Sequence, residues 1–189
     1  MSHRFFCRAL TLALLAAATS AFAAGPTSLL YAMRYKEFGG NVGLDKIQGV
    51  NWANTDSTYI DDLGIAVWGD VRTVGYFGLS IGQQYDLAGN PLGGGPYLNT
   101  YAPDYIVDGT SDGKYNYALG FYGGQVLQFD RNWQNPVALF SVNPNFIGNT
   151  AAITMNTIDG SFWVGDFGLN GTISHYSSGG TFLSSFSTG

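Results

Sequence analysis

The chain has 189 residues, with eight Lys or Arg against 13 Asp or Glu, a net charge of −5, and a single cysteine. This length indicates one domain or slightly more, and the acidic balance argues against nucleic acid and anionic membranes as partners. All but one of the acids are Asp, and they accompany 27 Gly and 12 Tyr. This composition is poor for helices and suits strands joined by tight turns.

The first 23 residues predict a secretory signal peptide. Two arginines lie in Met1–Arg8, Ala9–Ala18 is apolar, and Ala21-Phe22-Ala23 has the small residues that a signal peptidase requires. The apolar run is shorter than the roughly 20 residues of a membrane span, and no later stretch is long enough either. Cleavage near Ala23 removes Cys7 and leaves a net charge of −7. We therefore expect a secreted or periplasmic protein without disulfides.

Residues 24–63 predict an N-terminal strand followed by a connection. Leu29–Phe38 is apolar and aromatic enough for one or two strands. Gly39–Asp62 is rich in polar residues and glycine, which favours a long connection.

Three units of short strands follow, at about 64–98, 105–142 and 151–189. The strands expected in the first unit are Gly64–Val67, Val71–Phe77 and Ile81–Tyr85, and Gly93-Gly94-Gly95-Pro96 then predicts a loop. The strands expected in the second unit are Tyr105–Val107, Lys114–Leu119, Val126–Phe129 and Val137–Phe140. The strands expected in the third unit are Ile153–Met155, Ser161–Asp166, Thr172–Tyr176 and Thr181–Phe186. Asp-Gly pairs between such runs are strong hairpin signals.

The three units recur in phase. The aromatic residues that close the third strands are Tyr85, Phe129 and Tyr176, at spacings of 44 and 47. The isoleucines of the first strands are Ile65, Ile106 and Ile153, at spacings of 41 and 47. Periods of this size are typical of repeat architectures such as propellers. A β-sandwich whose hairpins are evenly spaced is the alternative.

Two segments resemble repeats of the NHL family. They are Gly64–Val67 with Gly69-Asp70, and Asp159–Phe167, which reads DGSFWVGDF. In that family a blade runs from an apolar strand through an Asp-Gly turn to a strand of the WV-D kind. The middle unit departs from this pattern, because Asn116-Tyr117-Ala118 stands where WV-D is expected.

The resemblance implies an all-β fold, a β-propeller-like array of four-stranded antiparallel blades. Closed rings of the family commonly have six blades, whereas this chain holds three to four at about 40–45 residues each. We therefore expect an incomplete ring, either a piece of a longer propeller or one that closes by association through its edge strands. In a ring, Leu29–Phe38 is expected as the outer strand of the last blade.

The search for catalytic chemistry finds little. His175 is the only histidine after signal cleavage, and its place in a β pattern favours a strand-packed or exposed side chain over a catalytic one. The acids of Asp108–Asp112 do not have the spacing of an EF-hand loop. No catalytic residue, metal ligand or cofactor is assigned, and the binding of a divalent cation is left open as an alternative.

The propeller interpretation selects one face for ligands. The loops that lead into first strands and the loops between second and third strands lie at the same end of each blade. Ligand sites in propellers usually lie at this end, by resemblance. The ligand-binding residues predicted on this face are Asp62, Asp104, Tyr122, Asn149, Phe167 and Asn170. A second set could either stack on a ligand or fill the spaces between blades: Trp52, Trp68, Trp133, Trp163, Tyr76 and Tyr122.

Three functions follow from these patterns. The favoured one is a secreted binding or scaffold module for a protein or a glycan. The second is a fragment of a propeller lyase or lactonase with a central divalent ion, for which Asp62, Asp104 and Asn149 are the candidate ligands. The third is a surface or matrix protein that self-associates.

Overall fold

The computed structural model describes residues 29–34, 43–48, 51–56, 62–78, 80–101, 104–142, 150–166 and 171–188. The predicted signal peptide lies outside these ranges. The chain divides into two units, Met1–Leu30 with Ile47–Trp52, and Tyr31–Lys46 with Ala53–Gly189. The three four-stranded sheets and the candidate site belong to the second unit. No described segment forms a helix long and apolar enough to cross a membrane.

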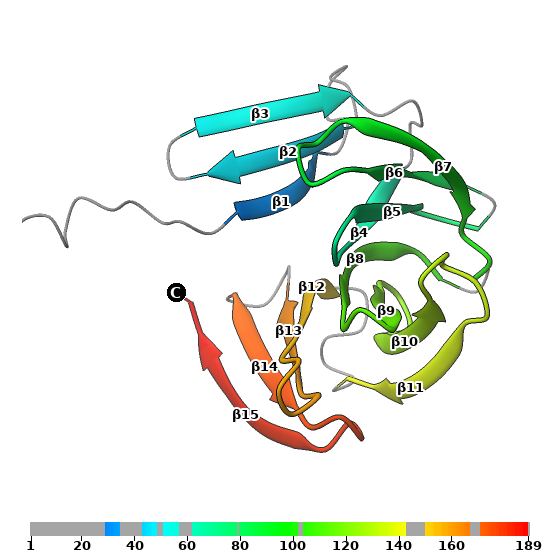
Figure 1. The fold of residues 1–189 in the computed structure, drawn as a ribbon. Coiled ribbons are helices and arrows are strands. Elements are labelled where there is room, and N and C mark those ends of the chain that lie inside the picture. Colours follow the sequence, from blue (N-terminus) through cyan, green and yellow to red (C-terminus); the bar gives the residue numbers. More distant parts are fainter. Residues whose placement is uncertain are drawn as a thin grey trace, which may run out of the picture. The chain divides into compact units, whose positions relative to one another are not determined.

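The described chain is all-β, and its strands pair in sequence order (Figure 1). A three-stranded sheet contains β1 (Leu29–Arg34), β2 (Gly43–Gln48) and β3 (Asn51–Asp56). The next sheet contains β4 (Asp62–Val67), β5 (Val71–Gly75), β6 (Ile81–Tyr85) and β7 (Pro91–Leu98). The third contains β8 (Ile106–Ser111), β9 (Tyr115–Gly120), β10 (Gln125–Asp130) and β11 (Val137–Ser141). The last contains β12 (Thr150–Met155), β13 (Phe162–Asp166), β14 (Thr172–Tyr176) and β15 (Phe182–Ser187). The predicted fold class, an array of antiparallel sheets, is confirmed.

The four-stranded sheets pack on one another in series. Their first strands are neighbours, β4 beside β8 and β8 beside β12. One core lies between the β4–β7 and β8–β11 sheets: Ala66, Val74, Tyr97, Ile106, Ala118, Leu127, Phe129 and Trp133. A second core lies between the β8–β11 and β12–β15 sheets: Tyr117, Leu119, Val126, Val142, Ile153, Phe162, Val164 and Tyr176. Each large apolar side chain buried in this way contributes about 1.5–3 kcal/mol.

The residues that marked the repeat in the sequence occupy equivalent places in the structure. Tyr85, Phe129 and Tyr176 close β6, β10 and β14, and all three are buried. The three isoleucines of the first strands are buried as well. The period in the sequence therefore reflects a contact that each sheet repeats.

The structure differs from the prediction in the N-terminal part. β2 and β3 lie within Gly39–Asp62, where a connection was expected. Their polar composition, Asn and Asp included, has low intrinsic β propensity, so pairing with neighbouring strands overrides it. β1 pairs with β2 and does not join the β12–β15 sheet, so the expectation that Leu29–Phe38 completes the last blade is wrong.

The glycine-rich segment 93–96 was expected as a loop but lies inside β7. β7 pairs with β6 at Gly82↔Tyr97 and at Gln84↔Leu92, so the segment bulges out between these two pairs. β7 is the outermost strand of its sheet. An edge strand tolerates Gly and Pro, because one side of its backbone needs no partner strand. β5 also ends at Gly75, two residues before the predicted end, which places Tyr76 and Phe77 in the following turn.

Candidate ligand-binding site

A run of five aromatic rings lies where the β5–β6 turn, the residue before β8 and the β9–β10 turn meet. Antiparallel pairing brings these segments to the same end of their strands, the face that the sequence selected. We call the five residues the aromatic run: Tyr76, Phe77, Tyr105, Phe121 and Tyr122.

The rings touch in sequence. Tyr76 stacks on Tyr105 with centroids 4.7 Å apart and planes at 23°. Tyr105 lies 5.1 Å from Tyr122, which meets Phe121 edge-on at 5.0 Å. Phe77 contacts both Tyr76 and Tyr105 edge-on, at 6.1 and 6.2 Å. Such offset and edge-on pairs each add about 0.5–1.5 kcal/mol beyond the area they bury. Tyr122 remains 55% exposed and Phe77 39% exposed. The run is therefore a packed group of rings in which Tyr122 and Phe77 face solvent.

Backbone hydrogen bonds hold the segments that carry the rings. The Ile106 amide donates to the carbonyl of Tyr76 at 2.7 Å, which links the β4–β7 and β8–β11 sheets. The Phe121 amide donates to the carbonyl of Tyr105 at 2.9 Å. These bonds fix the relative positions of the three segments, so the run is preorganised.

Asp104 supports the run from beneath. Its side chain is buried, and Oδ1 accepts hydrogen bonds from the amides of Tyr105 at 2.7 Å and Tyr122 at 2.8 Å. Oδ2 accepts from the amide of Gly123 at 2.6 Å. A Cβ at Gly120 would lie 2.5 Å from the Asp104 carboxylate. The sequence predicted Asp104 as a ligand-binding residue, and in the structure its carboxylate holds the β9–β10 turn.

Three polar groups lie at or beside the rings. Gln125 lies next to Gly123, and its Oε1 accepts a hydrogen bond from the Tyr101 hydroxyl. Burial first, and the Asp104 charge second, raise the pKa of Tyr101, so this hydroxyl stays protonated. Within the described part of the chain, the Gln125 amide nitrogen and the hydroxyls of Tyr105 and Tyr122 donate no hydrogen bond.

Of the other predicted site residues, Asp62 pairs with Gly75, the residue that precedes Tyr76 of the run, and three lie outside the described ranges. Asp62 is fully buried at the start of β4. Asn149, Phe167 and Asn170 are outside the described residues. Among the residues that the structure describes, no group of three or more His, Cys, Asp or Glu side chains is placed to hold a metal ion.

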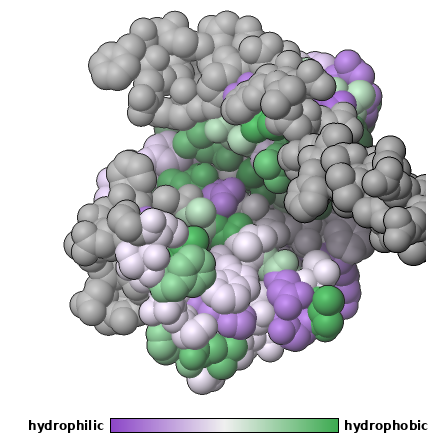
Figure 2. All heavy atoms as spheres, turned by 90° about the vertical axis from the view of Figure 1, so that its left-hand side faces the viewer, coloured by the Kyte–Doolittle hydropathy of each residue, from purple (hydrophilic) through white to green (hydrophobic). Residues whose placement is uncertain are grey.

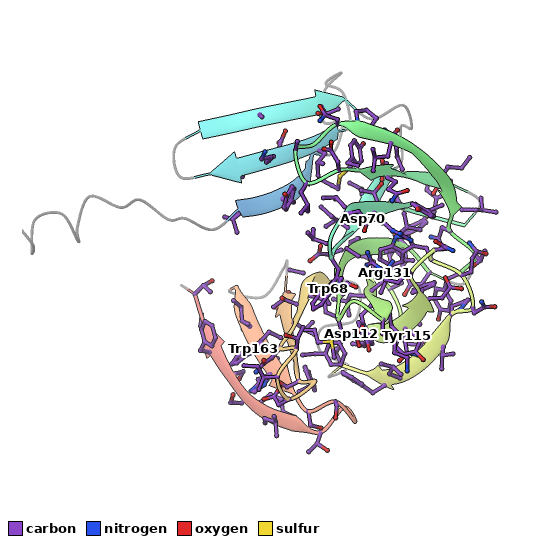
Figure 3. The ribbon with its side chains drawn as sticks, in the orientation of Figure 1. Trp68, Asp70, Asp112, Tyr115, Arg131 and Trp163 are labelled. Atoms are coloured by element: carbon purple, nitrogen blue, oxygen red, sulfur yellow. The ribbon has the colours of Figure 1, made fainter. Side chains whose placement is uncertain are left out.

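The opposite end of the same sheets carries an ion-pair network (Figure 3). Asp70 pairs with Arg72 at 2.7 Å and with Arg131 at 2.6 Å. Arg131 also donates to Ser111 Oγ, to Asn116 Oδ1 at 2.6 Å and to the Trp68 carbonyl. Because Asp70 belongs to the β4–β5 turn and Arg131 to the β10–β11 turn, this network fastens two neighbouring sheets. Its main donors are engaged within the protein, which indicates a structural role.

Trp68, Trp133 and Trp163 do not form one stacking surface, and the side chain of Trp52 lies outside the described part of the structure. Trp133 is fully buried in the core between two sheets, the structural alternative that the sequence offered. Trp68 is 52% exposed, at the end opposite the aromatic run. Trp163 stacks on His175 at 3.9 Å with nearly parallel planes, so His175 is packed on a strand. Of the predicted stacking set, only Tyr76 and Tyr122 belong to the aromatic run.

The Asp112-Gly113 turn has the hydrogen bonds and the positive φ that are typical of a β-hairpin turn. Asp112 Oδ1 accepts from the amides of Lys114 and Tyr115, and Oδ2 accepts from the Tyr117 hydroxyl. Burial raises the pKa of Asp112, but these hydrogen bonds outweigh it and leave the pKa lowered. Gly113 has a φ of 89°, a backbone conformation that residues other than glycine rarely adopt.

Solved structures share this architecture. A nidogen/laminin complex contains a chain 14% identical, with a TM-score of 0.57, and the match covers 83% of this chain and 61% of that one. A calcium-binding protein, regucalcin, from Agrobacterium tumefaciens is 11% identical with a TM-score of 0.56, covering 75% and 50%. A protein of unknown function from Bacteroides thetaiotaomicron is 12% identical with a TM-score of 0.56, covering 85% and 44%.

These likenesses identify the fold as a β-propeller type, and at such identities they speak to the fold alone. The chain spans 44 to 61% of the length of these three neighbours. No protein-family model matches the sequence, and no curated protein is similar to it.

Proposed function

We propose that the chain is an extracytoplasmic binding module of the β-propeller type that holds a protein or glycan partner against the aromatic run. The exposed rings on a fixed backbone are the observation that carries the proposal. The signal-like first 23 residues support a secreted or periplasmic location. The segments Gly64–Asp70 and Asp159–Phe167 support an assignment of the sheets to the NHL type.

The physical case rests on preorganisation. Exposed aromatic side chains supply large contact areas with few rotatable bonds, which is why Tyr and Trp dominate binding hot spots. Here the turns that display Tyr122 and Phe77 are already fixed by the Asp104 carboxylate and by backbone bonds. Binding therefore orders little that is not ordered beforehand, and less of the interaction energy is lost.

The test is partner capture with matched variants. The purified protein is immobilised and exposed to the extracytoplasmic fraction of its host, separated into protein and polysaccharide pools. Tyr122→Ala should lose most of the captured material, whereas Trp68→Ala, which removes a similarly exposed ring at the opposite end, should retain it. Equal capture by the two variants would contradict a binding role for the aromatic run.

Self-association is the second candidate, and the outer strand of the last sheet favours it. All six residues of β15 are exposed, and three of them, Phe182, Leu183 and Phe186, are large apolar residues. β15 is an edge strand without any charged residue or proline, the features that usually block edge pairing. Figure 2 views the molecule from the side of β15 and shows hydrophobic residues among polar ones on that surface.

Sedimentation velocity over a range of concentrations tests this second candidate. The wild-type protein should form dimers or larger species as concentration rises, and Leu183→Lys should shift the population toward the monomer. Ile158→Lys is the control, because Ile158 is 93% exposed in the β12–β13 turn and belongs to no strand edge. A wild-type protein that stays monomeric throughout rules the candidate out.

A further inference from the structure

We propose that the ligand of the aromatic run is a neutral glycan. This inference rests on the proposed function and names the chemistry of its partner. It follows from three properties of the run: ring surface, unengaged polar donors and the lack of an accessible charge.

The first property is ring surface with adjacent donors. A pyranose ring has a face of C–H groups and a rim of hydroxyls, so its binding sites combine apolar ring faces with a few placed polar groups. The aromatic run supplies the apolar area through Tyr122 and Phe77. The hydroxyls of Tyr105 and Tyr122 and the amide of Gln125 are the polar groups, and among the described residues none of them donates elsewhere.

The second property is neutrality. The five residues of the run carry no charge, and Asp104, which holds the backbone of the run, is buried with both carboxylate oxygens accepting hydrogen bonds from backbone amides. In the run and in Asp104, a cationic peptide would therefore meet no accessible carboxylate, and an anionic ligand would meet no cation. The overall negative charge further disfavours anionic ligands. A neutral glycan leaves no charge unpaired at this surface.

The third property is extent. The run crosses from one sheet to the next, with Tyr76 and Phe77 on the β5–β6 turn and Phe121 and Tyr122 on the β9–β10 turn. Tyr105 lies between the two pairs and contacts members of both. A group of rings that spans two sheets suits an oligosaccharide chain better than a single sugar.

Affinity electrophoresis on the purified protein tests the inference. Native gels contain galactomannan, arabinoxylan or hydroxyethyl cellulose as neutral probes and alginate as an anionic one. At least one neutral polysaccharide should retard the wild type and alginate should not. Tyr122→Ala should weaken the retardation at least about tenfold, the scale of a lost binding hot spot. Tyr122→Phe, which keeps the ring, should lose only a few-fold, and Trp68→Ala should match the wild type.

The inference is overturned if no neutral polysaccharide retards the protein, if alginate alone does, or if Tyr122→Ala binds as the wild type does. A second experiment separates failure of the glycan inference from failure of the proposed function. A photo-crosslinking residue replaces Tyr122, and the covalent adducts that form with the extracytoplasmic fraction are identified. A protein adduct that forms only at that position would overturn the glycan ligand and keep the binding module. Absence of any partner that depends on Tyr122, protein or glycan, would overturn both.

Discussion

Asp108 offers a sharp test of how this fold balances charge against burial. It lies in β8, and its Oδ2 accepts a hydrogen bond from the Ile153 amide of β12 at 2.8 Å, so it joins the first strands of two sheets. Burial raises the pKa of Asp108 to about 6, and the hydrogen bonds from the backbone of Ile153 and Gly109 offset only part of that rise. The ionised form is therefore less stable in the folded state than in the unfolded chain.

The sign and size of the effect follow from this shift. The folded state binds the proton more tightly than the unfolded state, whose carboxyl has a pKa of 3.8. The protonated Asp108 carboxyl therefore makes its full contribution to the stability of the folded state below pH 3.8, and this contribution is lost as the pH rises through about 6. At about 1.4 kcal/mol for each pKa unit, the loss reaches about 3 kcal/mol at neutral pH. This is an upper limit, because part of Asp108 still reaches solvent.

Asp108→Asn is the variant that tests it, since Asn keeps an acceptor for the Ile153 amide and cannot ionise. We expect the difference in unfolding free energy between variant and wild type, from urea titrations at pH 4 to 7, to grow in favour of Asn by up to about 3 kcal/mol. Using the difference cancels the titration of other carboxyls. A difference that stays constant over this range, or that favours Asp more as the pH rises, would refute the reasoning.

Three further predictions concern the parts that hold the sheets together. Trp133→Ala should lower the unfolding free energy by about 3–5 kcal/mol in urea titrations because it empties the core between two sheets, whereas the exposed Trp68→Ala should change it by less than about 1 kcal/mol. Arg131→Met should cost about 1–3 kcal/mol, and Arg131→Lys should recover only part of it because Lys cannot reproduce the forked contacts to Asp70 and Asn116. Asp104→Ala should cost about 2–3 kcal/mol by leaving three turn amides without their acceptor, and proteolysis at the β9–β10 turn should accelerate. A wild-type unfolding free energy for Trp133→Ala, Arg131→Met or Asp104→Ala would contradict the role assigned to that side chain.

Much of the fold could be predicted from the sequence because the same packing contact recurs in each four-stranded sheet and leaves a period in the sequence. Ile65, Ile106 and Ile153 recur because each first strand packs against the next sheet, and a core position tolerates few residue types. The Asp-Gly pairs could be recognised because their turns require positive φ, as Gly113 and Gly160 show. Where such constraints act, the pattern and the structure agree.

β2, β3 and the glycine-rich part of β7 could not be predicted, because pairing with neighbouring strands and not local composition determines their conformation. Asn51–Asp56 and the glycine-rich part of β7 have compositions that favour loops, and neighbouring strands impose the extended form on them. β7 is also an edge, where the requirement on residue type is weakest. Local propensity therefore fails at the positions where pairing with other strands decides the conformation.

The aromatic run was missed in part although its signal was in the sequence. Tyr76-Phe77 and Phe121-Tyr122 are adjacent aromatic pairs 45 residues apart, close to the period of the core isoleucines. A buried position repeats because packing demands it, but these pairs lie in turns, where Tyr122 and Phe77 remain largely exposed. Turn positions of a propeller carry no packing requirement for two successive aromatic residues, since polar residues and Gly are the usual choice there.

The same end of the sheets also shows what the sequence could not predict about Asp104. The position of its loop at the ligand face selects Asp104, but a buried carboxylate must be satisfied by hydrogen bonds, and its donors are the amides of Tyr105, Tyr122 and Gly123. Its carboxylate holds Tyr122 and its neighbours in place, and under the proposed function the ring residues are the ones that contact the ligand. Substituting Asp104 should consequently weaken binding through the position of the rings, whereas Tyr122→Phe, which keeps the ring and its contacts to Tyr105 and Phe121, should weaken binding and leave the stability of the sheets nearly unchanged.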